Sequence, residues 1–204
     1  AITIKDDLKY YNALIDTKKC VDCGLCTKVC PRENDNDMSK PKWWYQGWAD
    51  SEIREHASSG GAASAIIRAF IKNGGYVASC LFDSGKFVFE VTNEMAVARK
   101  FAGSKYVKSN PEKIYGKIQS LLKANQKVLF IGLPCQVAAV NQFIKDKTNL
   151  VTADLICHAT PSPYLLKKCL QEYGHDINTL TDINFRIKSL YELNRDGKPI
   201  AAFH

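Results

Sequence analysis

The pattern of hydrophobic and polar residues along the chain predicts an α/β fold. Helices are expected where apolar residues recur every three or four positions, and strands where short runs are rich in β-branched and aromatic residues. Helices are predicted over residues 62–72, 110–125, 136–145 and 163–173. Strands are predicted over residues 76–82, 87–92, 127–131 and 150–156.

Turn and capping residues set the boundaries of several of these elements. The pair Gly74-Gly75 ends the first helix, and the turn Asp83-Ser84-Gly85 joins two strands. The pair Asn110-Pro111 is favourable for the N-cap and first position of a helix, and it predicts that the second helix begins there.

The last two predicted strands are connected by a short helix and should therefore be parallel, as in a βαβ unit. The predicted fold class is α/β: a mixed sheet with flanking helices that contains this parallel βαβ unit. Cys135 and Cys157 lie just beyond the carboxyl ends of these two strands, the edge where open α/β sheets bind ligands. If the strands are neighbours, the two thiols can share a cofactor. Alternatively, each is a buried apolar cysteine that ends a strand.

Four more cysteines near the N-terminus form a C-x2-C-x2-C-x3-C-P run, made of Cys20, Cys23, Cys26, Cys30 and Pro31. This spacing is the ligand pattern of a bacterial-type iron-sulfur cluster, whose fourth cysteine ligates the other cluster in two-cluster ferredoxins. Fortuitous spacing or a structural zinc is the alternative interpretation. We therefore divide the chain into a partial 4Fe-4S ferredoxin-like module (1–33), a linker (34–50) and an α/β domain (51–204). We expect a first cluster motif to precede residue 1.

Composition and charge limit the class of protein. A hydrophobic content of 46% in 204 residues is enough for a buried core. The formal net charge of +7 comes from scattered lysines, so a lysine-rich surface is favoured over a nucleic-acid site. Eight cysteines suit a reducing compartment, and residues 62–71, the most apolar stretch, are too short to span a membrane. The sequence thus predicts a cytoplasmic protein without a membrane span.

Two glycine-containing segments are suited to binding a phosphate. Ser58-Ser59-Gly60-Gly61 precedes the helix predicted at residue 62, where backbone N–H groups and hydroxyls would face an anion. Gly103-Ser104-Lys105-Tyr106 offers a flexible backbone, a cation and an aromatic ring. Each signal is weak alone, because the first segment also fits a simple helix cap preceded by a turn.

Taken together, these motifs resemble, in order, those of the coenzyme F420 hydrogenase/dehydrogenase beta-subunit family, in which F420 denotes a deazaflavin cofactor. The resemblance spans nearly the whole chain. It is carried by Ser-Ser-Gly-Gly at 58–61, Phe-Ala-Gly-Ser-Lys-Tyr-Val at 101–107, Val-Leu-Phe-Ile-Gly-Leu-Pro-Cys-Gln at 128–136, Asp-Leu-Ile-Cys-His-Ala-Thr-Pro-Ser-Pro at 154–163 and Phe-Arg-Ile-Lys at 185–188. Ala159 and Leu133 depart from the residues that the family often has there, without removing a ligand.

The resemblance implies a flavin, usually FAD, in the α/β domain, with electrons passing between a hydride-exchanging substrate and 4Fe-4S clusters. FMN is the alternative flavin. The family further implies that Cys135 and Cys157 are two ligands of an additional 4Fe-4S cluster, completed by a later C-x2-C pair, so the chain is expected to be truncated at both ends. Residues 58–61 and 103–106 are the candidates for holding the flavin.

The predicted function is that of an iron-sulfur flavoprotein oxidoreductase subunit with a redox partner protein and a small-molecule hydride donor or acceptor. His158, beside Cys157, is the candidate proton donor, or it simply hydrogen-bonds a loop carbonyl. Two other classes stay open. One is a non-catalytic ferredoxin-like module that docks a partner, and the other is a zinc-stabilised interaction protein.

Overall fold

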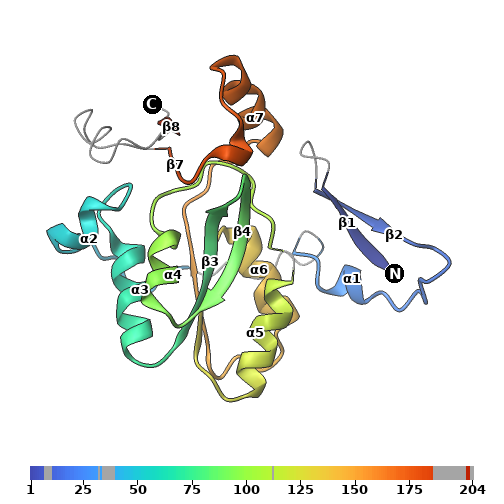
Figure 1. Cartoon of the computed structure of the whole chain (residues 1–204). Helices are drawn as coiled ribbons and strands as arrows, with labels where there is room; N and C mark the ends of the chain where they lie inside the picture. The colour runs from blue at the N-terminus through green and yellow to red at the C-terminus, as the bar shows by residue number, and fades with distance from the viewer. Residues whose placement is uncertain (7–10, 32, 34–39, 112, 186–200, 203–204) are drawn as a thin grey trace.

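The structure of the chain is a computed structural model (Figure 1). It describes residues 1–6, 11–31, 33, 40–111, 113–185 and 201–202. Its helices are α1 (Leu25–Lys28), α2 (Ser51–Glu55), α3 (Ala62–Lys72), α4 (Met95–Ala98), α5 (Ile114–Lys123), α6 (Pro134–Phe143) and α7 (Pro163–Glu172), with short 3-10 turns η2 (Arg99–Phe101) and η3 (Ile177–Thr179). Its strands are β1 (Ile2–Asp6), β2 (Tyr11–Ile15), β3 (Tyr76–Asp83), β4 (Lys86–Thr92), β5 (Val128–Gly132), β6 (Leu150–Asp154), β7 (Ile183–Asn184) and β8 (Ala201–Ala202).

Four strands form the central sheet in the order β4-β3-β5-β6. Strands β3 and β4 are an antiparallel pair, whereas β5 runs parallel to both β3 and β6. Helix α6 is the crossover between β5 and β6, so these elements form the βαβ unit that the sequence predicts. The predicted α/β class, a mixed sheet with flanking helices, is confirmed.

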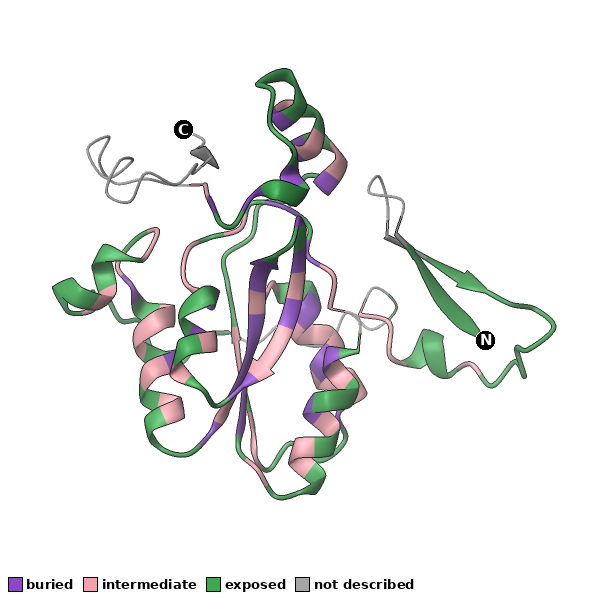
Figure 2. Cartoon of the chain, viewed as in Figure 1, coloured by how far each residue is buried: buried purple, intermediate pink, exposed green. Residues whose placement is uncertain are grey.

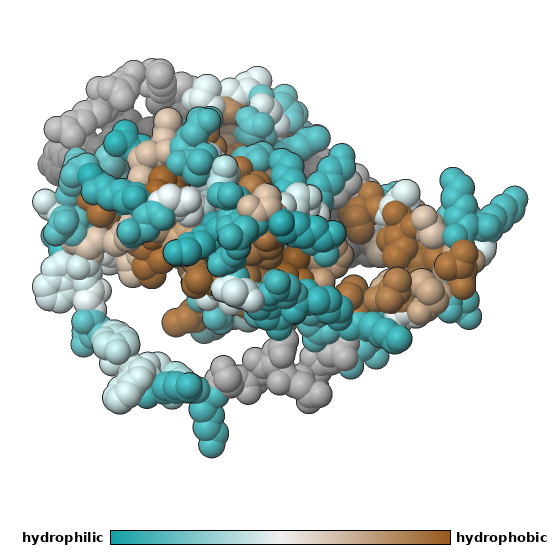
Figure 3. All heavy atoms as spheres, turned by 90° about the horizontal axis from the view of Figure 1, so that it is seen from below, coloured by the Kyte–Doolittle hydropathy of each residue, from teal (hydrophilic) through white to brown (hydrophobic). Residues whose placement is uncertain are grey.

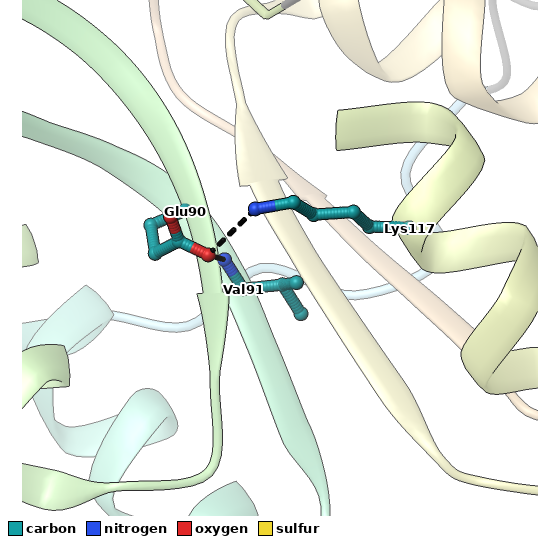
Figure 4. Close-up of polar contacts among 3 residues, drawn as sticks. All are labelled: Glu90, Val91 and Lys117. Carbon is teal, nitrogen blue, oxygen red and sulfur yellow. Dashed lines mark hydrogen bonds and ion pairs between the residues drawn. The ribbon is translucent and has the colours of Figure 1, made fainter. Parts of the chain in front are cut away.

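Helices cover both faces of the sheet (Figures 1 and 2). Strand β5, whose side chains alternate between the two faces, is therefore buried along its whole length. On one face, Val128 and Phe130 belong to a core cluster with residues of α5 and α6, namely Ile114, Ile118 and Val140. On the other face, Leu129 and Ile131 belong to a cluster with residues of α3, α4 and η2, namely Ile67, Ala98 and Phe101. Helix α5 is also tied to β4 by an ion pair between Lys117 and Glu90 at 3.1 Å (Figure 4).

The prediction that Asn110 caps the second helix is wrong. Asn110 instead forms a β-bridge with Val88, and its N–H donates to the Phe87 carbonyl at 2.8 Å. Helix α5 begins only at Ile114, after Lys113, whose φ of 66° is left-handed. The bridge holds the backbone of Asn110 against β4, so the segment continues along the sheet before it turns into the helix.

Two of the other boundaries that differ from the predicted ones lie next to the candidate cysteines. Helix α6 begins at Pro134, two residues earlier than predicted, because the Gln136 side chain accepts the Leu133 N–H at 2.9 Å and caps the turn. Strand β6 ends at Asp154, two residues earlier than predicted. Both changes place Cys135 in the first turn of a helix and Cys157 in a loop.

The N-terminal part contains an antiparallel hairpin of β1 and β2, in which Ile2 pairs with Ile15 and Ile4 with Ala13. These side chains are exposed, and Figure 3 shows hydrophobic residues gathered on this hairpin at the right of the view. Within the predicted linker, residues 34–39 lie outside the described residues, and residues 40–50 contain neither helix nor strand. Of the helices that the structure describes, none has the length and apolar character needed to cross a membrane.

Candidate functional site

Cys135 and Cys157 lie at the same edge of the sheet. Their strands, β5 and β6, are adjacent, and the last residues of the two strands, Gly132 and Asp154, are register partners. The Gly132 carbonyl also accepts the Leu155 N–H at 2.9 Å, so the two segments stay joined beyond the strands. Both cysteines are exposed, so the alternative of buried apolar cysteines does not hold.

Exposed thiolates are suitable ligands for an iron-sulfur cluster, so the donor chemistry at this edge fits such a group. Within the described ranges, however, no three His, Cys, Asp or Glu side chains are gathered so as to hold one metal ion. The ligand roles of Cys135 and Cys157 therefore remain predictions.

The N-terminal cysteines lie around the short helix α1. Cys20, Cys23 and Cys26 are exposed, and Cys30 is half-buried. Gly24, with a φ of 65°, turns the chain into α1, a backbone conformation that glycine adopts without strain. None of these four cysteines is in a disulfide, and cysteine sulfurs at this spacing are typical ligands of an iron-sulfur cluster.

The structure brings together the two segments that are predicted to hold a flavin. The Ser104 N–H donates to the Ser58 hydroxyl oxygen at 2.7 Å, which joins the loop at 103–106 to the turn before α3. Gly61 is the N-cap of α3, with a φ of 79° and no side chain that caps the helix. The first N–H groups of this eleven-residue helix are therefore presented beside the Ser58–Ser104 contact.

The glycines before α3 also have a packing role that the sequence does not reveal. The Ala49 N–H donates to the Gly60 carbonyl at 2.7 Å, and a Cβ atom on Gly60 would lie 3.3 Å from the Gly47 carbonyl oxygen. A Cβ atom on Gly61 would lie 3.1 Å from that of Ala49. Close approach of the segment at 47–49 is thus one reason for the glycine pair, independent of any ligand.

Lys105 supports its own loop. Its ammonium donates to the carbonyls of Lys100, Phe101 and Ala102, at 3.0, 3.0 and 2.6 Å, and so caps the end of η2. Burial lowers the pKa of Lys105 to about 8, against the opposing effects of Cys80 and Asp182. All three donors of the ammonium are used in these contacts, so a contact with a cofactor would replace one of them.

The other two candidate residues of this region are more exposed. Tyr106 is 48% exposed and packs edge-on against Phe185, with ring centroids 6.0 Å apart. His158 lies exposed in the loop after β6, next to Cys157. Arg186 and Lys188, from the last predicted family motif, lie outside the described residues.

Two further cysteines lie within helices and strands. Cys80 lies on β3 and Cys169 on α7, and both are partly buried. Burial raises the pKa of Cys80 to about 11, which Lys105 and a hydrogen bond with Ser109 partly offset. A thiol held protonated in this way is a poor ligand.

A buried pair, Ser109 and Gln136, is missing from the sequence prediction. The Gln136 side-chain amide donates to the Ser109 hydroxyl at 3.1 Å while its carbonyl oxygen accepts the Leu133 N–H. Glutamine three residues after the N-cap of a helix is a known capping signal and could have indicated the local contact. Nothing in the spacing indicates Ser109, which lies 27 residues away in the chain.

Comparisons with known proteins match both parts of the chain. Residues 125–203 match the family model for the C terminus of the beta subunit of coenzyme F420 hydrogenase/dehydrogenase, and residues 11–32 match a 4Fe-4S binding domain. An uncharacterized protein of Methanocaldococcus jannaschii is 27% identical over 141 residues, which are 64% of this chain and 39% of that protein.

The fold also resembles a solved structure. A chain of the F420-reducing NiFe hydrogenase complex from Methanosarcina barkeri, in a xenon derivative, matches with a TM-score of 0.53 and 18% identity over 67% of this chain and 51% of that chain. This chain thus spans about half the length of that neighbour and less of the M. jannaschii relative.

The match over residues 11–32 supports an iron-sulfur cluster in the N-terminal part. Cys135 and Cys157 fall within the first matched region, and Cys20 to Cys30 within the second. The resemblance drawn from the sequence is confirmed as far as these matches reach: residues 125–203 are similar to the C terminus of the coenzyme F420 hydrogenase/dehydrogenase beta subunit, and residues 11–32 are similar to a 4Fe-4S binding domain.

Proposed function

We propose that this chain is part of an iron-sulfur flavoprotein oxidoreductase subunit that passes electrons between a hydride-exchanging organic substrate, a flavin and 4Fe-4S clusters. The substrate class that fits the family match is a deazaflavin. The flavin is FAD or FMN, and a partner subunit exchanges electrons with the clusters.

The observation that carries the proposal is the arrangement at the carboxyl edge of the sheet. Two exposed thiols follow the adjacent strands β5 and β6. The loop at 103–110 ends beside the start of β4, where the Asn110 N–H donates to the Phe87 carbonyl. The Lys108 N–H donates to the Pro161 carbonyl at 3.0 Å, which joins this loop to the segment after Cys157. The same loop reaches Ser58 through Ser104. A flavin held by residues 58–61 and 103–106 would therefore lie close to the cysteines.

The residues have distinct proposed roles. The N–H groups at the start of α3 and the hydroxyls of Ser58 and Ser59 hold the phosphates of the flavin, with Gly60 and Gly61 allowing close approach. The loop at 103–106 contacts the rest of the cofactor, with Tyr106 as the exposed aromatic ring. His158, beside Cys157, is the proposed proton donor to the reduced flavin or the substrate. The flavin, when bound, supplies the conversion between two-electron and one-electron transfer.

The cysteines complete the proposed route for electrons. Cys20, Cys23 and Cys26 ligate one 4Fe-4S cluster, and Cys30 ligates a second one in the manner of two-cluster ferredoxins. Cys135 and Cys157 are two ligands of a further cluster at the sheet edge. The protein fixes the distances and surroundings of these groups and thereby their reduction potentials.

Absorption spectroscopy and elemental analysis of the protein purified anaerobically from the complete reading frame test this proposal. We expect flavin absorption bands together with iron and acid-labile sulfide. Iron and sulfide without any flavin would instead support the ferredoxin-like module that docks a partner. A colourless protein that contains zinc would overturn both interpretations.

A further inference from the structure

We infer that Gln136 is a positioning residue for Cys135 and that Ser109 holds Gln136 in place, so that the loop at 103–110 and the turn carrying Cys135 form one hydrogen-bonded unit. The inference deepens the proposed function and rests on it for the ligand role of Cys135. The coupling between Ser109, Gln136 and the turn that carries Cys135 rests only on hydrogen bonds between described residues.

Gln136 closes the turn that presents Cys135. Its side-chain oxygen accepts the Leu133 N–H at 2.9 Å, across Pro134 and Cys135. Gln136 itself is 9% exposed, whereas Cys135, its neighbour in the chain, is exposed. The buried side chain therefore fixes the backbone on both sides of an exposed thiol, which is the arrangement that a preorganised ligand needs.

The position of Gln136 depends in turn on Ser109. The Gln136 side-chain amide donates to the Ser109 hydroxyl at 3.1 Å, and both residues are buried. A buried amide that lost this acceptor would be left unpaired or would turn toward water. Turning would also move its oxygen away from Leu133, because the two ends of the amide are rigidly connected.

Gly132 makes room for this arrangement and extends it to the second cysteine. A Cβ atom on Gly132 would lie 3.1 Å from the Gln136 side-chain oxygen and 2.8 Å from the ring of Phe130. Its carbonyl accepts the Leu155 N–H, two residues before Cys157. The loop that carries Ser109 is also bonded to the far side of Cys157, through Lys108 and Pro161.

Thiol alkylation of the apoprotein tests the coupling without iron or flavin. The rate at which iodoacetamide modifies Cys135 is measured by peptide mass spectrometry, with Cys23 as the internal reference. Ser109→Ala and Gln136→Leu should each change the rate of Cys135 alkylation, relative to that of Cys23, by about fivefold. Loss of one hydrogen bond changes the population of the capped turn by about this factor. Ser109→Thr, which keeps the hydroxyl, should restore the ratio of the unsubstituted chain.

Ser79→Ala is the matched control. Ser79 is as buried as Ser109, and its hydroxyl donates to the Ile131 carbonyl at 3.1 Å, one residue before Gly132 but outside the Ser109–Gln136 contact. We expect this variant to leave the ratio unchanged. An unchanged ratio in Ser109→Ala, or an equal change in Ser79→Ala, would overturn the inference. Failure of the proposed function is distinguishable, because it would show as retention of all iron in Cys135→Ser.

Discussion

The Ser58 hydroxyl accepts the Ser104 N–H at 2.7 Å and thereby joins two segments that are 46 residues apart. One segment ends at the N-terminus of α3, and the other is the loop that leaves η2. Both are candidates for holding a flavin on separate sequence grounds. Their contact means that a ligand on the α3 N-terminus would also meet the loop at 103–106.

Replacing Ser58 by Ala should weaken flavin binding. The substitution removes the acceptor for the Ser104 N–H and one hydroxyl next to the α3 N-terminus, and a single hydrogen bond corresponds to about a fivefold change in affinity. Titration of the purified apoprotein with FAD, followed by fluorescence quenching, measures the change. Ser120→Ala is the control, because its hydroxyl bonds within α5 at the Gly116 carbonyl. Equal affinities in the two variants would contradict the flavin assignment of residues 58–61.

Replacing Cys135 by Ser in the complete protein should lower the iron content, because a hydroxyl is a much poorer iron ligand than a thiolate. Cys80→Ser is the control, since Cys80 is partly buried on β3 and its thiol stays protonated. Iron and sulfide analysis of both proteins measures the difference. Loss of iron in neither variant, or in both, would remove Cys135 from the ligand set.

The sequence is most informative where local patterns and packing agree. Helix α3 has the predicted bounds, because Gly61 precedes it and Gly74 and Gly75 follow it. The parallel pair β5 and β6 follows from one short crossover and from the buried character of β5. In each case the signal lies within one continuous segment of the chain, so no distant contact is needed to interpret it.

Prediction fails where a distant backbone partner decides the outcome. Asn110 has good capping chemistry, yet its N–H bonds to Phe87 in another part of the chain. Lys105 suggests a free cation, but its ammonium is held by the carbonyls at the end of η2. The contact between Ser109 and Gln136 depends on the register of the loop over the sheet, which no spacing in the sequence specifies.

Two cysteines of the N-terminal run, Cys23 and Cys30, should respond differently to substitution. If Cys30 ligates a second cluster, Cys30→Ser should leave the iron of the local cluster in place, whereas Cys23→Ser should remove it. Mössbauer or electron paramagnetic resonance spectra of the two proteins, prepared at matched iron loading, separate the clusters. Loss of the same signal in both variants would show that Cys30 completes the local cluster.

Lys105 should make stability rise with pH in alkaline solution. Its pKa is about 8 in the fold, below the ordinary value of 10.5, so the unfolded chain binds the extra proton over this window. The destabilisation is present in full below pH 8 and is relieved as the pH rises toward 10.5. Urea unfolding of the chain and of Lys105→Met at several pH values measures the effect as a difference between the two proteins.

Cys80 should oppose this trend at higher pH. Its pKa is raised from 9.0 to about 11, so the folded state keeps a proton that the unfolded chain loses, and stability falls as the pH rises through this range. The contribution of Lys105 is therefore clearest between pH 8 and 9. A stability difference between the chain and Lys105→Met that does not change across this interval would contradict the lowered pKa.

Two glycines at helices should give opposite results when replaced by alanine. Gly61→Ala should destabilise the fold by roughly 1–2 kcal/mol, because alanine is strained at a φ of 79° and its Cβ atom would lie 3.1 Å from that of Ala49. Gly116→Ala, within α5, should stabilise by about 0.5–1 kcal/mol, since no atom lies within 4 Å of the added Cβ and alanine favours the helix. Chemical denaturation of both variants provides the two free energies of unfolding. If the two substitutions changed stability in the same direction, the left-handed turn at Gly61 would not be the constraint that begins α3.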